Sequence, residues 1–120
     1  MQVRGSRVLV VEDQYLIADE VVRLLKSWGA EVLGPARDID AAISIVEQSR
    51  VDLAVLDINM RGRKIYPAAD ALRKRGIPFV FLSAYDRSEV RADFHNAVFI
   101  GKPFPPQTLR SALEDLAMAP

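Results

Sequence analysis

Short, mostly apolar runs recur about every 20 to 25 residues along the chain, and each is followed by a stretch of helical character. The five runs are residues 8–11, 30–33, 53–56, 79–82 and 98–100. Runs of this length, bounded by turn residues, are typical of strands buried on both faces of a parallel sheet. The hydrophobic pattern therefore predicts five strands.

The stretches between these runs carry helix signals. Over residues 14–28 the apolar positions share one helical face: Ile17, Val21, Leu24, Leu25 and Trp28. Gly29 is suited to end this helix, and Asp38 to begin the next one. Pro67 fits the first turn of a third helix, which Gly76 would stop. The turn after residue 33 is predicted at Gly34 and Pro35, and a polar loop is predicted over residues 60–64.

Toward the end of the chain the hydrophobic pattern predicts two more helices, and the first of them is weakly indicated. Residues 86–94 are only weakly periodic, so we expect the fourth helix to be short or irregular. Pro105 or Pro106 would begin a last helix, which carries four apolar positions: Leu109, Ala112, Leu113 and Leu116.

Repeated strand–helix units predict a parallel sheet with right-handed crossovers and helices on both faces. Five units are too few to close a barrel of eight. We therefore expect an α/β fold with an open, doubly wound five-stranded parallel sheet. At 120 residues, the chain is expected to form a single domain over residues 1–120.

Composition narrows the classes of function. Sixteen basic and sixteen acidic residues cancel, so no net charge favours direct binding of nucleic acid or of anionic lipid. No apolar run approaches the roughly 20 residues that cross a bilayer, and the polar N-terminus is not a signal peptide. The absence of cysteine excludes disulfides and thiolate metal sites. We expect a cytoplasmic protein.

Polar side chains follow four of the predicted strands at the same end. Glu12 and Asp13 follow the first, Asp57 ends the third, Ser83 ends the fourth, and Lys102 follows the fifth. The carboxyl ends of parallel strands meet at one edge of the sheet, where ligands of such folds bind. Alone, each residue is more typical of a helix start, a turn or a solvated loop. Together they predict a site.

The chemistry of these residues is complementary. Three neighbouring carboxylates raise one another's pKa, and Mg²⁺ would remove that conflict, with the backbone carbonyl of Asn59 as a further ligand. A carboxylate such as Asp57 can also attack phosphorus and form an acyl phosphate. Lys102, the Ser83 hydroxyl, backbone N–H groups and Mg²⁺ could then stabilise the phosphoryl oxygens.

Four motifs resemble the receiver domain of bacterial two-component response regulators. They are Val8-Leu9-Val10-Val11-Glu12-Asp13, Leu56-Asp57, Ser83-Ala84 and Lys102-Pro103-Phe104. The resemblance extends over about residues 7–116. It implies the flavodoxin-like, CheY-like strand order 2-1-3-4-5.

The resemblance also implies the roles of the site. Asp57 would accept a phosphoryl group from a sensor histidine kinase or a histidine phosphotransfer protein, and Glu12, Asp13 and Asp57 would hold Mg²⁺. Lys102 would pair with the phosphoryl group. Such a protein catalyses only its own phosphorylation and dephosphorylation, so we do not expect an enzyme with a separate substrate.

Signalling by this family implies a switch and a partner. Ser83 would respond to phosphorylation, and Phe99 falls where receivers carry the switch aromatic. The Lys102–Pro103 peptide would be cis. A downstream protein partner would read the switched face, and the family leaves open a homodimer.

The chain departs from the usual pattern in places. Arg61 stands where many receivers have proline, residues 83–102 form a shorter stretch than usual, and the usual Gly-Ala turn before the fifth strand is missing. Residues 66–72 and 76–79 resemble stand-alone receivers common in alphaproteobacteria. That subgroup usually has Ala-Thr-Gly-Tyr where this chain has Leu-Ser-Ala-Tyr over residues 82–85.

Two other functions share part of this pattern. A phosphatase of the haloacid dehalogenase type also uses an aspartate nucleophile, Ser or Thr, Lys and Mg²⁺. Its nucleophile follows the first strand, whereas here the acidic pair comes first. A pseudo-receiver would bind partners without being phosphorylated. Phosphorylation by a small phosphodonor would distinguish the receiver from the pseudo-receiver.

Overall fold

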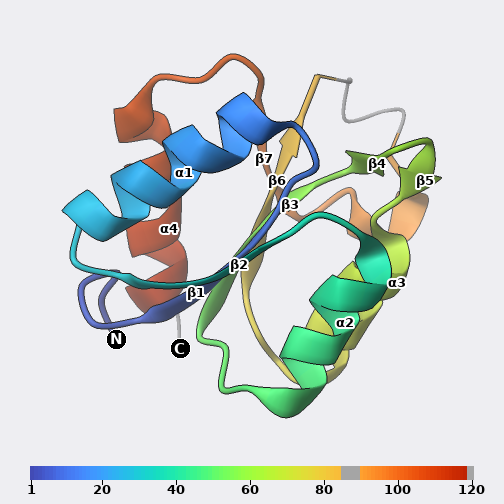
Figure 1. Cartoon of the computed structure of the whole chain (residues 1–120), viewed down its shortest axis with the longest axis horizontal. Coiled ribbons are helices and arrows are strands. Elements are labelled where there is room, and N and C mark those ends of the chain that lie inside the picture. The colour runs from blue at the N-terminus through green and yellow to red at the C-terminus, as the bar shows by residue number, and fades with distance from the viewer. Residues whose placement is uncertain (85–89, 119–120) are drawn as a thin grey trace.

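The computed structural model describes residues 1–84 and 90–118, and its centre is a five-stranded parallel sheet (Figure 1). The strands, in spatial order, are β2 (Glu31–Ala36), β1 (Arg7–Val11), β3 (Leu53–Asp57), β6 (Phe79–Ser83) and β7 (Val98–Gly101). Counted along the chain among these five, the order is 2-1-3-4-5. The predicted doubly wound sheet is therefore confirmed.

Helices cover both faces of the sheet (Figure 1). One face carries α1 (Tyr15–Ser27) and α4 (Pro106–Met118), and the other carries α2 (Ile39–Gln48) and α3 (Tyr66–Lys74). None of the described helices is long and apolar enough to span a membrane.

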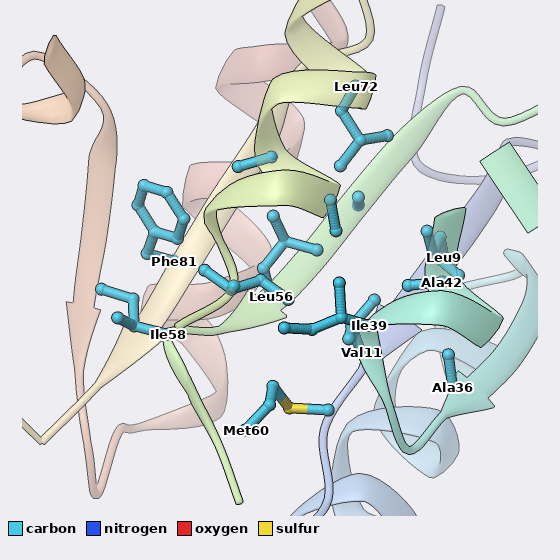
Figure 2. Packing of buried hydrophobic residues seen from close by; sticks show 14 of the residues in the cluster. Leu9, Val11, Ala36, Ile39, Ala42, Leu56, Ile58, Met60, Leu72 and Phe81 are labelled. Atoms are coloured by element: carbon cyan, nitrogen blue, oxygen red, sulfur yellow. The ribbon is translucent and has the colours of Figure 1, made fainter. Parts of the chain in front are cut away.

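Each strand supplies both cores because successive side chains point to opposite faces. In β1, Leu9 packs with the core under α2 and α3, whereas Val8 and Val10 pack under α1 and α4. Figure 2 shows the first core, in which Leu56 and Phe81 lie on the sheet. This two-sided burial explains why the strands are continuous apolar runs.

The predicted helix boundaries are largely those observed. The Asp38 side chain caps α2 by accepting a hydrogen bond of 2.7 Å from the Ala41 N–H. Pro67 lies in the first turn of α3. Gly76 follows the end of that helix with a φ of 70°, a conformation that glycine adopts without strain.

Strand β2 is longer than predicted. Its pattern indicated an end at Leu33, but the strand continues through Gly34 and Pro35 to Ala36. The register with β1 shifts between the pairs Leu9–Leu33 and Val11–Ala36. A proline is tolerated here because β2 lies at the edge of the sheet, where a missing N–H costs no ladder bond.

The predicted polar loop over residues 60–64 contains a small hairpin. Strands β4 (Asn59–Met60) and β5 (Arg63–Lys64) pair antiparallel, and their two-residue turn is Arg61–Gly62. Both turn residues have positive φ, 54° and 82°, as a type I′ turn requires. The Met60 side chain is buried in the core and fixes the base of the hairpin.

Little helix is present in the described part of the segment between β6 and β7. In its described part, residues 90–97, the regular structure is a single 3-10 turn, η2 (Ala92–Phe94). This turn fits the prediction of a short or irregular fourth helix. Residues 86–89 of that prediction lie outside the described residues.

Candidate active site

The predicted carboxylates converge at the carboxyl edge of the sheet. Glu12 and Asp13 directly follow β1, and Asp57 is the last residue of the neighbouring β3. One oxygen from each of the three side chains can be chosen so that all lie within 4.8 Å of one another. The parallel sheet thus brings together residues 44 positions apart in the sequence, Asp13 and Asp57, in one acidic cluster.

Lys102 enters the same cluster from the loop after β7. Its Nζ lies 2.8 Å from Oε1 of Glu12 and 3.3 Å from Oδ2 of Asp57. The backbone N–H of Lys102 donates to the carbonyl oxygen of Ser83 at 2.9 Å, which fixes the loop against β6. The Lys102–Pro103 peptide is cis, as the resemblance implies.

Two carboxylates of the cluster are buried. Glu12 is 1% exposed and Asp57 is 5% exposed, whereas Asp13 is partly accessible. Burial raises the pKa of Glu12 to about 7, and the hydrogen bond and charge of Asp57 act in the same direction. The hydrogen bond from Lys102 opposes this rise but does not cancel it.

Backbone groups hold the two buried carboxylates. The N–H of Gln14 donates to Oε2 of Glu12 at 3.1 Å, and the N–H of Asn59 donates to Oδ1 of Asp57 at 3.3 Å. Both donors lie two residues after the acid, so the local backbone turn orients each side chain. The role of the Asn59 carbonyl as a metal ligand stays a prediction.

The donor set fits a hard divalent cation. All available ligands are oxygens, and three acidic side chains share a small volume with one lysine. Burial, and then the neighbouring Asp57, raise the pKa of Glu12, and a bound cation would favour its ionised form. Oxygen ligands and a site partly open to water suit Mg²⁺, which retains several waters.

A cavity of about 530 Å³ opens over the cluster. Its lining includes Asp57, Asn59, Lys102 and Pro103 of the predicted site, together with residues to which sequence reasoning gave no role in the site: Gln14, Ile17, Glu20, Ala84 and Phe104. The position of Gln14, at the start of α1 directly after the acidic pair, was the available signal for it.

The two predicted switch residues lie on adjacent strands. Ser83, at the end of β6, is buried and pairs with Gly101 of β7, two residues after Phe99. The Phe99 ring is partly buried, and its centroid lies 5.2 Å from that of Phe81. The structure thus places Phe99 against the core rather than in the carboxylate cluster, and its switching role stays a prediction.

Comparisons with known proteins identify chains that this one resembles. A family model described as the response regulator receiver domain matches residues 8–114. The chain is 33% identical over 112 residues to the transcriptional regulatory protein PdtaR of Mycobacterium tuberculosis, with 90% of this chain and 55% of PdtaR aligned. It is 31% identical to the sensory transduction protein LytT of Bacillus subtilis, with 90% of this chain and 46% of LytT aligned. The chain therefore spans about half the length of these curated relatives.

Solved structures of two related proteins are similar to this chain over nearly its full length. The solution structure of SdrG from Sphingomonas melonis Fr1 is 32% identical with a TM-score of 0.83, covering 97% of this chain and 98% of SdrG. The response regulator PhyR from Brucella abortus is 25% identical with a TM-score of 0.83, covering 96% of this chain and 49% of PhyR.

Proposed function

The chain belongs to the response regulator receiver domain family of two-component systems, and we propose that it accepts a phosphoryl group on Asp57 in a phosphorelay. The observation that carries this proposal is the cluster itself. Asp57 ends a central strand beside two further carboxylates, and the Lys102 ammonium lies 3.3 Å from its Oδ2. A nucleophile, a cation site and a fixed positive charge thus share one edge of the sheet.

The chain's own residues would perform the transfer as follows. A carboxylate oxygen of Asp57 forms a bond to phosphorus while the bond from phosphorus to the donor's histidine nitrogen breaks, and its electron pair stays on that nitrogen. The Asn59 N–H orients the Asp57 carboxylate, and Lys102 offsets the charge of the transferred group.

Mg²⁺ would be held by Glu12, Asp13, Asp57 and the carbonyl of Asn59, and when bound it would supply positive charge to the phosphoryl oxygens. The ammonium of Lys102 is hydrogen-bonded to Oε1 of Glu12 at 2.8 Å, and a shift of this ammonium toward the phosphoryl group would exchange that bond for one to a phosphoryl oxygen. This exchange would link phosphorylation to a change in the loop after β7.

The family implies the partners. We propose a sensor histidine kinase or a histidine phosphotransfer protein as the phosphodonor and a downstream protein as the reader. Relatives named transcriptional regulatory proteins are about twice as long as this chain, so direct contact with nucleic acid is not carried over to it. The protein would catalyse its own phosphorylation and dephosphorylation and no other reaction.

Phosphorylation would be transmitted through Ser83 and Phe99. The Ser83 hydroxyl lies at the end of the strand next to β3, so a small movement toward Asp57 would let it donate to a phosphoryl oxygen. That movement would leave space that the Phe99 ring could fill. Burying a Phe side chain fully is worth roughly 1.5–3 kcal/mol, enough to shift a two-state equilibrium about ten- to a hundredfold.

Acetyl phosphate with and without Mg²⁺, followed by intact mass, tests the proposal. We expect the wild type to gain one phosphoryl group only with Mg²⁺, and Asp57→Asn to gain none. Asp13→Ala should need at least about tenfold more Mg²⁺, because it loses a direct oxygen ligand. Asp40→Ala is the matched control, since it removes an exposed carboxylate on α2.

Three outcomes would contradict the proposal. Absence of labelling in the wild type with Mg²⁺ would favour a pseudo-receiver. Equal labelling of Asp57→Asn would remove Asp57 as the acceptor. An unchanged requirement for Mg²⁺ in Asp13→Ala would remove Asp13 from the metal site.

A further inference from the structure

Four charged side chains join the segment after β6 to helix α3. Asp70 and Arg73 come from α3, and Arg91 and Asp93 come from η2 and the residue before it. Arg73 Nη2 lies 2.8 Å from Asp93 Oδ2 and 3.0 Å from Asp70 Oδ1. Arg91 lies 2.7 Å from Asp70 Oδ1 through Nη2 and 2.6 Å from Asp93 Oδ1 through Nε. The four residues therefore form a closed ring of ion pairs.

The ring rests on two aromatic side chains. The guanidinium carbons of Arg73 and Arg91 lie 4.2 and 4.8 Å from the centroid of the Phe94 ring, and Arg91 lies 4.9 Å from that of Tyr66. The Tyr66 and Phe94 rings stack with their centroids 5.6 Å apart. The Tyr66 hydroxyl accepts a hydrogen bond of 3.0 Å from the backbone N–H of Arg91. These contacts hold Phe94, which is 3% exposed, in the core.

Phe94 connects the ring of ion pairs to the candidate switch. Its centroid lies 5.5 Å from that of Phe81, and Phe81 lies 5.2 Å from Phe99. Phe81 pairs with Leu56 in the sheet, directly before Asp57, and lies two residues before Ser83. A movement of Phe99 can therefore reach Phe94 through Phe81.

The proposed function expects Lys102 to contact carboxylates before a phosphoryl group arrives, and Lys102 is paired with Glu12 and Asp57. Resting on the proposed function, we propose that Asp70, Arg73, Arg91 and Asp93 form a latch that holds residues 90–94 on α3 in the resting state and opens on phosphorylation. The output surface would then include α3 and η2.

The composition of the latch suits reversible opening. Its side chains are 39–46% exposed, and exposed ion pairs are individually weak. Hydrogen bonds from Arg91, and then from Arg73, hold the pKa of Asp93 well below its usual range, so the Asp93 carboxylate stays ionised at neutral pH. Each of these exposed ion pairs can break and re-form at little cost in free energy.

The affinity of the protein for beryllofluoride with Mg²⁺ tests the latch. The solved relative SdrG has a BeF3-activated conformation, which makes this phosphoryl mimic a suitable probe. Because the mimic binds the open state, weakening the latch enlarges the binding-competent fraction. Arg91→Ala and Asp93→Asn should each bind the mimic about three- to tenfold more tightly in calorimetry.

Two further variants separate the latch from a purely structural role. Arg23→Ala breaks an exposed ion pair with Asp19 on α1, and it should leave the affinity at the wild-type value. Asp93→Glu keeps the carboxylate that Arg73 and Arg91 contact, and it should bind the mimic less tightly than Asp93→Asn does.

The outcomes distinguish the two proposals. If the wild type binds the mimic and the latch variants bind it equally tightly or more weakly, the latch is wrong and the proposed function stands, even where the variants melt at a lower temperature. If the wild type does not bind the mimic, the proposed function is wrong, and the latch, as a part of that switch, falls with it.

Discussion

At the scale of single residues, Glu12 is the site residue whose pKa is raised by its surroundings. It is almost fully buried, and its closest charged neighbours are Asp57, which disfavours its ionised form, and Lys102, which favours it. The lysine satisfies one oxygen of Glu12, yet the pKa still rises to about 7. Glu12 is therefore the residue at which proton binding, metal binding and stability are linked.

This linkage predicts how the metal-free protein responds to pH. A carboxyl whose pKa is raised by folding stabilises the fold below its usual pKa, near 4.5, and loses that contribution as pH rises toward 7. We expect the wild type to lose on the order of 2 kcal/mol more than Glu12→Gln between about pH 5 and about pH 8. Urea unfolding with a metal chelator measures this difference.

Added Mg²⁺ should reverse the effect because it replaces the proton on Glu12. The affinity for Mg²⁺ should rise with pH up to about 7 and then become constant. If Glu12→Gln and the wild type showed parallel dependence of stability on pH, the raised pKa of Glu12 would be contradicted.

Residue types and order were enough to predict that the three carboxylates and Lys102 lie together. Glu12, Asp13, Asp57, Ser83 and Lys102 all lie at the end of a strand or directly after it, and a parallel sheet brings such ends to one edge. The pairing of the Lys102 ammonium with Glu12 as well as Asp57 could not be predicted in the same way. It depends on the path of one loop, which the sequence pattern does not determine.

At the scale of elements, the β4–β5 hairpin could not be predicted from the hydrophobic pattern. Two-residue strands are too short to show an alternating pattern, so residues 60–64 resembled a polar loop. The turn was also hidden, because type I′ turns usually begin with Asn, Asp or Gly. Among the described residues, Arg61 is the one non-glycine residue with positive φ.

The strained position of Arg61 yields a stability prediction. Replacing it by asparagine, which tolerates the left-handed region better, should raise the free energy of unfolding by about 0.5 to 1 kcal/mol. Arg63→Asn removes the same charge from the adjacent strand and should give no gain. A loss of stability in Arg61→Asn, measured by urea unfolding, would show that the guanidinium contributes more than the strain costs.

The ion pairs between α3 and η2 were equally inaccessible from the sequence. Arg91 contacts Asp70 across 21 positions, and no periodicity or motif connects them. For residues 90–94 the weak periodicity correctly indicated little helix, but the ion pairs that anchor these residues to α3 appear only in the structure.

At the scale of the whole molecule, five apolar runs and their spacing determined the fold class, because each run is buried on both faces by helices. The order of the strands came from the family resemblance and is confirmed. The extension of β2 through Gly34 and Pro35 was missed because an edge strand tolerates residues that would end a central one.

The ring contacts from Phe99 through Phe81 to Phe94 predict which residues change when the protein is phosphorylated. The mimic beryllofluoride with Mg²⁺ should change hydrogen-exchange protection between residues 90 and 113, which contain η2, β7 and much of α4. Residues 39–48 of α2 belong to the same core as Phe94 but pack over β1 and β2, away from β7, and serve as the internal control. Changes confined to residues 14–28 would place the output on α1 instead.

The central claim is that Asp57 is the residue that carries the phosphoryl group. Borohydride converts an acyl phosphate to an alcohol, so it marks the carboxylate that was phosphorylated. After treatment with acetyl phosphate and Mg²⁺, peptide mass mapping should find the reduced side chain at Asp57 alone, and it should vanish without Mg²⁺. A reduced side chain at Glu12 or Asp13, or none at any carboxylate, would contradict the account.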